Sequence, residues 1–331
     1  MKAEELALLI KGLTDRLGRV EKRLSAAEKT AGSLTAPGPA AKQPEPKEAQ
    51  PPWKMDAAHV ESLVADMYSA AKNNPLAALD FEVGGTGNYL TAHARNVSKL
   101  AMFLADRHGL SEASTRTVGI CGLLHDAGMD CLPYELVSEG RPLTQEEYLQ
   151  VRTHPSRGAE YIKQHYRFGS LLSSVIPAVV EQHHERSDGT GYPNGLAGGR
   201  IHNFARVLAI ADSYEAMTTP RPFRAPRHPA DAMRALLVQG CHSEETGMYD
   251  RSMLKTFVWS SSLYPIGCKV DLADGRLARV VSATADPKRP VIKLLTGSRS
   301  GQVVNLTQHR KLSIAGGTNA AAGPAQQVKK T

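Results

Sequence analysis

The pattern of hydrophobic and polar positions divides the chain into a long helical part and a short β part. Between residues 55 and 260, apolar residues recur at the spacings of three and four that an amphipathic helix requires, as Val97, Leu100 and Leu104 do. Thr144 and Glu147 have the spacing of a capping box that opens a helix. The pattern predicts helices over residues 59–71, 89–108, 113–127, 144–162, 171–184, 204–217, 229–239 and 252–259.

The pattern changes at Tyr264-Pro265. Four short segments that follow are β-branched or alternate between apolar and polar residues, and Asp-Gly, Asp-Pro and Gly-Ser turns separate them. They predict strands over residues 268–272, 277–282, 291–295 and 302–306. The expected fold is therefore mainly α, with an all-helical domain over 55–262 and a small antiparallel β module over 263–314.

Both ends of the chain differ from this body. In residues 1–30, apolar residues alternate at spacings of four and three, which predicts a coiled coil and a homodimer formed through it. An amphipathic helix packed on its own domain is the alternative. Residues 31–54 are rich in proline and alanine and predict a linker, and residues 315–331 are rich in alanine, glycine and glutamine and predict a disordered tail.

Composition and charge narrow the class of protein. The net charge of +7 comes from the ends, because residues 1–54 contribute +3, residues 310–331 contribute +4, and the body is balanced. This distribution does not indicate a nucleic-acid polymer as partner. The chain contains no apolar run of about 20 residues, no signal-peptide pattern and only four scattered cysteines. We expect a cytoplasmic protein without a membrane span, a disulfide framework or a cysteine-based zinc site.

Seven histidine and aspartate residues, both of them types that bind metal ions, occupy positions where the helices would otherwise bury apolar side chains. Burial of several carboxylates and imidazoles together is costly unless cations neutralise them. The last two histidines precede a loop with two glycines and a proline, which cannot continue a helix and can leave a site open to substrate. The sequence therefore predicts a metal site formed by His93, His125, Asp126, His154, His183, His184 and Asp212.

These residues carry a resemblance to a known family. The spacing of His93, His125-Asp126 and Asp212 resembles the HD superfamily of metal-dependent phosphohydrolases. His154 and the run His-His-Glu-Arg-Ser-Asp-Gly-Thr-Gly-Tyr-Pro that begins at His183 resemble the HD-GYP subfamily. The resemblance spans roughly residues 85–260.

The resemblance implies an activity and a site. It implies hydrolysis of cyclic di-GMP to the linear dinucleotide pGpG, with GMP as a possible further product, by a hydroxide that two divalent metal ions share. Iron or manganese suits the imidazole-rich ligand set best, and zinc or nickel is the alternative. By this resemblance His93, His125, Asp126 and Asp212 hold one metal ion, and His154, His183 and His184 hold the second. Asp126 bridges the two, and Asp126 and His125 are the expected catalytic residues.

Four further residues are candidates for substrate binding. Arg221 and Arg224 lie in a proline-containing loop after Asp212, where guanidinium groups can bind phosphate. A solvated loop is the alternative for these arginines. Gly191 and Tyr192 are expected to shape the loop beside the site, the glycine by adopting a positive φ and the tyrosine through its ring and hydroxyl.

Two departures from the family pattern affect the expected activity. Met129 stands where the family usually has a lysine after His-Asp-x-Gly, so this position offers no charge and no hydrogen-bond donor. Tyr89 stands where some members of the family have a glutamate that binds a third metal ion. Because tyrosine replaces it, we expect two metal ions. The alternative from another functional class is a weakly active or inactive member of the family. Such a protein would bind cyclic di-GMP and signal through its coiled coil to a protein partner. A third alternative keeps the chemistry but acts on another nucleotide.

Overall fold

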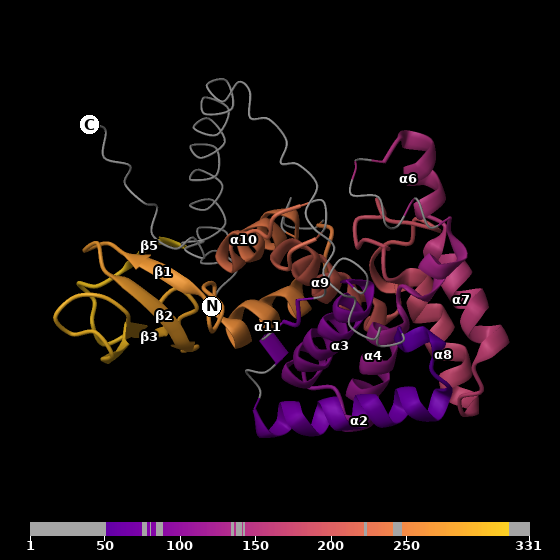
Figure 1. The fold of residues 1–331 in the computed structure, drawn as a ribbon, viewed down its shortest axis with the longest axis horizontal. Coiled ribbons are helices and arrows are strands. Elements are labelled where there is room, and N and C mark those ends of the chain that lie inside the picture. Colours follow the sequence, from indigo (N-terminus) through magenta and orange to yellow (C-terminus); the bar gives the residue numbers. More distant parts are fainter. Residues whose placement is uncertain are drawn as a thin grey trace, which may run out of the picture.

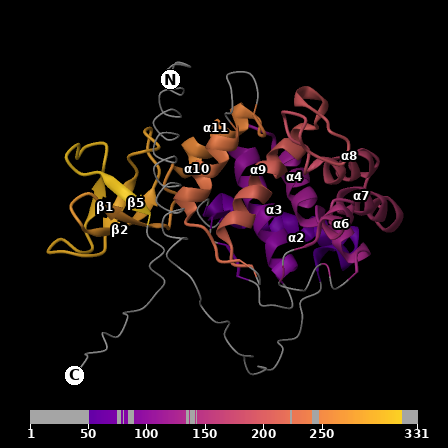
Figure 2. The same ribbon diagram turned by 90° about the horizontal axis from the view of Figure 1, so that it is seen from above.

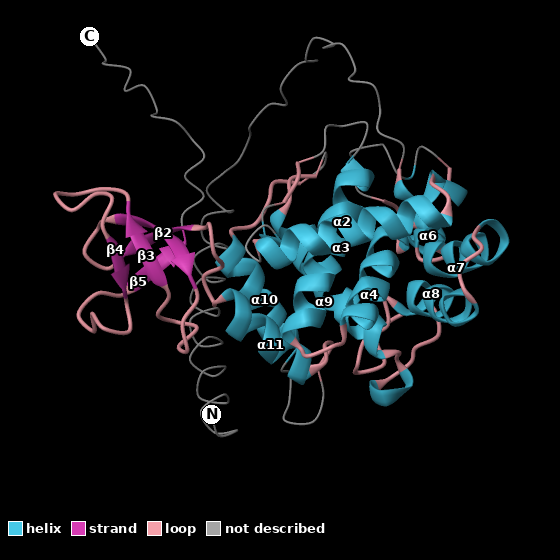
Figure 3. Cartoon of the chain, turned by 90° about the horizontal axis from the view of Figure 1, so that it is seen from below, coloured by secondary structure: helices cyan, strands magenta, loops and turns pink. Residues whose placement is uncertain are grey.

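The computed structural model describes residues 51–74, 78–79, 81–83, 89–133, 136, 141, 143–221, 224–240 and 247–317. The predicted coiled coil and most of the predicted linker and tail lie outside these residues. Helices form one part of the described chain and strands form the other, as the sequence pattern predicts (Figures 1 and 3). No helix among the described residues is long and apolar enough to cross a membrane.

The helical part confirms most of the predicted segments. Asp56, Ser111 and Asp250 cap helix N-termini through their side chains, and Thr144 and Glu147 form the predicted capping box. The helices are α2 (Ala57–Asn73), α3 (Tyr89–Arg107), α4 (Glu112–Leu124), α6 (Gln145–Val151), α7 (His154–His165), α8 (Ser170–Gln182), α9 (Asn203–Thr218), α10 (Pro229–Gly240) and α11 (Arg251–Ser261), with the 3-10 turns η1 (Pro52–Lys54), η3 (Ala127–Cys131) and η4 (Gly198–Arg200).

Helices α3, α4 and α9 form the centre of the body (Figure 2). Their inward faces are apolar and fully excluded from solvent, as at Leu100, Leu123 and Ile210. Burial of each such side chain contributes about 1.5–3 kcal/mol, which fixes the three helices against one another. Because His93, His125 and Asp212 lie on or directly after these helices, the core also fixes where those side chains stand.

The single helix predicted over residues 144–162 is wrong: the structure has two helices, α6 and α7. Pro155 has no N–H to donate to the carbonyl of Val151, four residues earlier, so a continuous helix would leave that carbonyl unsatisfied. The carbonyl of Val151 instead lies 2.8 Å from Nδ1 of His154. The break therefore places a predicted metal ligand at the junction of two helices.

The end of the predicted linker is part of the fold. Pro52 and Trp53 are buried in η1, and Trp53 is only 2% exposed, although we expected residues 31–54 to bury no core. Tyr161 and Tyr166 on and after α7 donate hydrogen bonds to the carbonyls of Trp53 and Pro52, each at 3.3 Å. A tryptophan ring buries enough apolar surface to order a short segment that its prolines alone would leave extended.

The β module contains the four predicted strands and one more. Strands β1 (Lys269–Leu272), β2 (Leu277–Ser282), β3 (Val291–Leu294), β4 (Val303–Asn305) and β5 (Ile314–Gly317) form an antiparallel sheet in the order β4-β3-β2-β1-β5. Strand β5 pairs with β1 where we expected the disordered tail to begin, at residue 315. Its glycines gave no strand pattern because pairing at a sheet edge uses backbone groups alone. The module contacts α10 through β5. Nε2 of His228, the residue directly before α10, lies 2.9 Å from the Lys269 carbonyl.

Candidate metal centre

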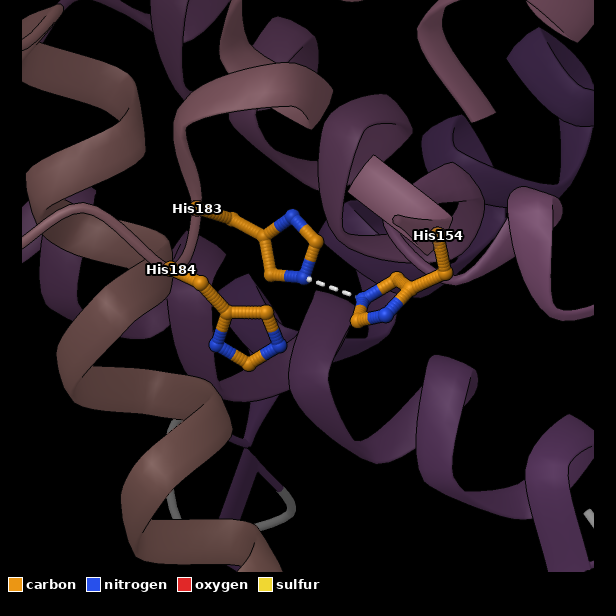
Figure 4. A group of neighbouring side chains, drawn as sticks. All are labelled: His154, His183 and His184. Carbon is orange, nitrogen blue, oxygen red and sulfur yellow. Dashed lines mark hydrogen bonds between the residues drawn. The ribbon is translucent and has the colours of Figure 1, made fainter. Parts of the chain in front are cut away.

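All seven predicted metal ligands lie together, on or directly beside the helices α3, α4, α7, α8 and α9. Two groups have ligand atoms within 4.8 Å of one another: His93 with His125 and Asp126, and His154 with His183 and His184. Figure 4 shows the second group, with the three imidazoles turned towards one another. Asp212 lies between the groups, with one oxygen 3.2 Å from Nε2 of His93 and the other 3.9 Å from Nδ1 of His184.

Three of the histidines are oriented by the same local contact. His125 follows the last residue of α4, His183 follows α8, and His154 follows the break after α6. The Nδ1 atom of each lies 2.6–2.9 Å from the carbonyl oxygen three residues earlier. The last carbonyls of a helix lack intrahelical partners and can only accept. Each Nδ1 must therefore carry the proton, and each Nε2 presents a lone pair to the site.

These lone pairs fit a cation and little else. The Nε2 atoms of His154 and His183 lie 3.2 Å apart (dashed in Figure 4), and neither has a proton to share because both Nδ1 atoms are donors. Burial lowers the pKa values of both imidazoles, which keeps them neutral. The buried Nε2 of His125 has no hydrogen-bond partner among the described residues. Divalent cations, one at each group, would satisfy all three atoms.

Asp126 connects the two groups. One carboxylate oxygen lies 3.3 Å from Nε2 of His154, and the other lies 3.4 Å from Nε2 of His125 and 3.7 Å from Nε2 of His93. Burial by itself would raise the pKa of Asp126, but the neighbouring histidines lower it below its ordinary value. A single ionised carboxylate thus faces ligand atoms of both groups, which is the placement expected of a bridging ligand.

Glu215 supports His93 from the side away from the site. Its Oε2 lies 2.5 Å from Nδ1 of His93, and its Oε1 accepts a hydrogen bond of 2.9 Å from the Asn96 amide. Glu215 and Asn96 are both fully buried. Burial would lower the pKa of His93, but the carboxylates of Glu215 and Asp212 raise it to about 10. Without a cation, His93 is therefore protonated at neutral pH.

This protonation predicts that metal binding releases a proton at pH 7. The raised pKa of His93 stabilises the metal-free fold below the ordinary pKa of about 6.5, and this stabilisation is lost as pH rises through about 10. Metal affinity should accordingly rise by about tenfold per pH unit between pH 7 and 9, since the metal replaces the proton on Nε2. Calorimetric titration in two buffers of different ionisation enthalpy measures the release. Glu215→Gln should reduce it, and an equal heat in both buffers would contradict the prediction.

Gly128 brings the turn η3 into direct contact with α7. A Cβ atom at this position would lie 2.0 Å from the His154 carbonyl oxygen and 2.5 Å from the Gly158 nitrogen. Only glycine permits this approach, which holds His154 beside Asp126. Met129, the residue that replaces the usual lysine, follows in the same turn and is partly buried.

The loop after His184 is closed by a buried carboxylate. Glu185 is 1% exposed and accepts hydrogen bonds from the backbone nitrogens of Asn194 (2.7 Å) and Leu196 (2.9 Å). The expectation of a positive φ at Gly191 is wrong, since the positive φ values in this loop belong to other glycines. Gly191 is required for another reason: a Cβ there would lie 2.4–2.5 Å from backbone atoms of residues 184–186.

Tyr192 supports His184. The rings of Tyr192 and His184 stack with centroids 4.7 Å apart. The guanidinium of Arg152, the residue directly after α6, lies 4.6 Å from the centroid of the tyrosine ring. Burial raises the pKa of Tyr192, so its hydroxyl stays protonated. The peptide bond to Pro193 is cis.

The two candidate arginines have different surroundings. Their backbones pair with each other through two 3.0 Å hydrogen bonds, so both stand in one tight loop. The positive charge of Arg221 opposes the rise in the pKa of His93 that Glu215 and Asp212 cause, whereas the Arg224 guanidinium donates to the Ala216 carbonyl near the end of α9. Arg221 is therefore the one whose charge reaches the ligands.

Sequence reasoning missed the residues that hold the ligands in place. Glu215 follows Asp212 by three residues and Asn96 follows His93 by three, so each pair shares a helix face. Two polar residues at this spacing in an otherwise apolar helix were the signal from which Glu215 and Asn96 could have been predicted. For Glu185 the signal was its position directly after two histidines. Arg152 gave no signal, because its contact to Tyr192 crosses 40 residues of chain.

Comparison with known proteins agrees with this geometry. The family model described as "HD domain" matches residues 86–251. The chain is 33% identical to "Cyclic di-GMP phosphodiesterase PA4108" of Pseudomonas aeruginosa over 69% of this chain and 53% of the relative. It is 31% identical to "3'3'-cGAMP-specific phosphodiesterase 1" of Vibrio cholerae over 55% of this chain and 40% of that protein. It is 33% identical to "Cyclic di-GMP phosphodiesterase response regulator RpfG" of Xanthomonas campestris pv. campestris over 44% and 37%.

These relatives are longer than the match. The chain spans about half the length of the first of them and less of the other two. The family model covers half of this chain and includes every one of the seven ligand-type residues. The motif that begins at His183 and the centre it helps to form lie within the matched part. The chain therefore belongs to the HD domain family and carries an HD-GYP domain.

Proposed function

We propose that this protein is a metal-dependent phosphodiesterase that hydrolyses cyclic di-GMP to pGpG, with GMP as a further product. The observation that carries the proposal is the pair of ligand groups joined by Asp126. The names of the relatives support the substrate class, since all three describe phosphodiesterases of cyclic dinucleotides.

The ligand sets follow from the two groups. His93, His125, Asp126 and Asp212 would hold one cation, and His154, His183 and His184 would hold the other, with Asp126 shared. Five imidazoles and two carboxylates favour iron or manganese, and zinc or nickel could also bind. Such cations supply an activated water for attack on phosphorus and neutralise charge on the phosphate.

The surrounding residues would hold the substrate. Arg221 would bind a phosphate, and Arg224, whose backbone pairs with that of Arg221, would complete the same loop. Tyr192 and Gly191 would form the wall of the site beside His184. Asp212, whose pKa neighbouring His93 and His184 hold well below its ordinary value despite burial, would remain a carboxylate throughout.

A turnover assay tests the proposal. The purified full chain, kept under reducing conditions, is analysed for metal and then incubated with cyclic di-GMP and added Mn²⁺ or Fe²⁺. Formation of pGpG with either metal supports the proposal, and nucleotide binding without product under both metals contradicts it. A parallel reaction with 3'3'-cGAMP separates the two substrate classes named among the relatives.

The second candidate is a cyclic di-GMP sensor with weak or no turnover, and Met129 favours it. A lysine there would add a positive charge beside the phosphate, so Met129→Lys should raise turnover by roughly tenfold or more. Met129→Leu, which changes shape but not charge, is the matched control and should not raise it. Turnover that is equal in all three proteins would show that Met129 is not the limiting departure.

The predicted coiled coil would make the protein a dimer and could bind a signalling partner. Deleting residues 1–30 and measuring mass by light scattering tests this part by itself. A dimer that persists after the deletion contradicts it.

A further inference from the structure

Residues of the β module line a basic pocket. Figure 1 shows this module at the opposite end of the described chain from α7 and α8. The volume of the pocket is about 550 Å³, within the range of about 300–1,000 Å³ that small-molecule sites occupy. Its lining includes four cationic side chains, Arg276, Arg299, Arg310 and Lys311, and the buried apolar side chains Leu294 and Val304.

The charged side chains that line this pocket are all positive. Its lining contains four permanent cations and no carboxylate. Arg276 is held by Asp274 at 2.7 Å, which orients its guanidinium. Within the part of the chain that the structure describes, no carboxylate lies within ion-pair distance of Arg299, Arg310 or Lys311. Cations gathered in one concavity attract an anion more strongly than the same cations spread over a flat surface.

The turn after β3 builds one wall of the pocket. Gly297 and Gly301 have φ values of +87° and +89°, which let the chain reverse tightly around Arg299. A Cβ on Gly297 would lie 3.0 Å from Cδ of Arg276, so glycine also leaves room for the arginine stem. The wall is therefore set by backbone geometry rather than by chance placement of a surface side chain.

We infer that this pocket binds a phosphorylated nucleotide, with phosphate on the arginines and the base against Leu294 and Val304. A concave site with both cationic and apolar side chains in its lining matches a ligand that has both an anionic and a flat apolar part. A membrane surface or a nucleic-acid polymer would instead require a flat or extended basic face. The site is separate from the metal centre. The choice of cyclic di-GMP and its products as first probes rests on the proposed function.

Nucleotide binding to the full chain tests the inference. The chain carries Asp126→Asn, which is expected to prevent turnover during the titration. Calorimetric titrations use cyclic di-GMP, pGpG, GMP and inorganic phosphate. The pocket variant adds Arg299→Glu and Arg310→Glu. The matched control adds Arg279→Glu and Lys288→Glu, which are exposed residues of the same module outside the pocket and carry the same change of charge.

We expect one nucleotide-binding step to weaken at least tenfold in the pocket variant and to change less than twofold in the control. Equal weakening in both variants, or no change in the pocket variant, would overturn the inference. Tighter binding of a single-stranded RNA oligonucleotide than of any mononucleotide or dinucleotide would overturn it in favour of a polymer site. Inorganic phosphate that binds as tightly as the nucleotides would also overturn it.

Turnover measured on the otherwise unchanged chain, with and without the pocket substitutions, keeps the two proposals apart. Absence of pGpG formation in the unchanged chain contradicts the proposed function and leaves the calorimetric result standing. Normal turnover together with no pocket-dependent binding step contradicts this inference alone.

Discussion

Asp126→Asn should lower the affinity for the two proposed metal ions by more than about 100-fold, beyond the loss expected for residues that only support a ligand. The carboxylate faces Nε2 atoms of both groups at 3.3–3.7 Å, so the two groups share its charge. An amide keeps the shape but carries no charge and coordinates cations weakly. Turnover of cyclic di-GMP should fall in parallel. Metal content after dialysis and calorimetric titration with Mn²⁺ measure the effect.

Asp130→Asn is the matched control for this substitution. Asp130 lies four residues further along, in η3, and its only ion pair among the described residues is an exposed one with Lys54 at 3.2 Å. Exposed pairs of this kind contribute about 0–1 kcal/mol, so metal binding should be unchanged. If Asp126→Asn still bound two equivalents of metal with the affinity of the unchanged chain, Asp126 would not be the shared ligand.

Gly128→Ala should destabilise the fold and separate the two ligand groups. The added Cβ would lie 2.0 Å from the His154 carbonyl oxygen. Neither atom can rotate away, because the oxygen belongs to the backbone and the Cβ is bonded directly to it. Overpacking of this kind costs about 1–3 kcal/mol. Relief requires η3 and α7 to move apart, and a displacement of about 1 Å in a catalytic site can cost about 100-fold in rate. Thermal unfolding and turnover measure the two effects.

The metal stoichiometry of Gly128→Ala distinguishes displacement from general unfolding. Only His154 among the ligands belongs to α7, so the group of His154, His183 and His184 should lose affinity before the group of His93 does. Gly199→Ala is the control, because no atom lies within 4 Å of the position of its Cβ and its φ is not positive. Equal stability and turnover in Gly128→Ala and Gly199→Ala would show that η3 and α7 tolerate the added methyl group.

The sequence by itself determined most of the described helices, four of the five described strands and the identity of the seven ligand-type residues. Helix and strand periodicity follow from local geometry, and buried histidines and carboxylates stand out against apolar neighbours because their burial needs compensation. The resemblance carried by Gly191, Tyr192 and the paired histidines also depends on adjacent residues alone.

Tertiary structure alone decided how those residues are held. The bond from His93 to Glu215 crosses 122 residues, and the approach of Gly128 to α7 depends on how two elements pack. Glycine is likewise required at position 191 by a close backbone contact and not by a positive φ. Such contacts have no periodic signal, because a single residue in one segment meets a single residue in another. The break at Pro155 was readable from the chain, yet only the structure shows that it turns His154 towards Asp126.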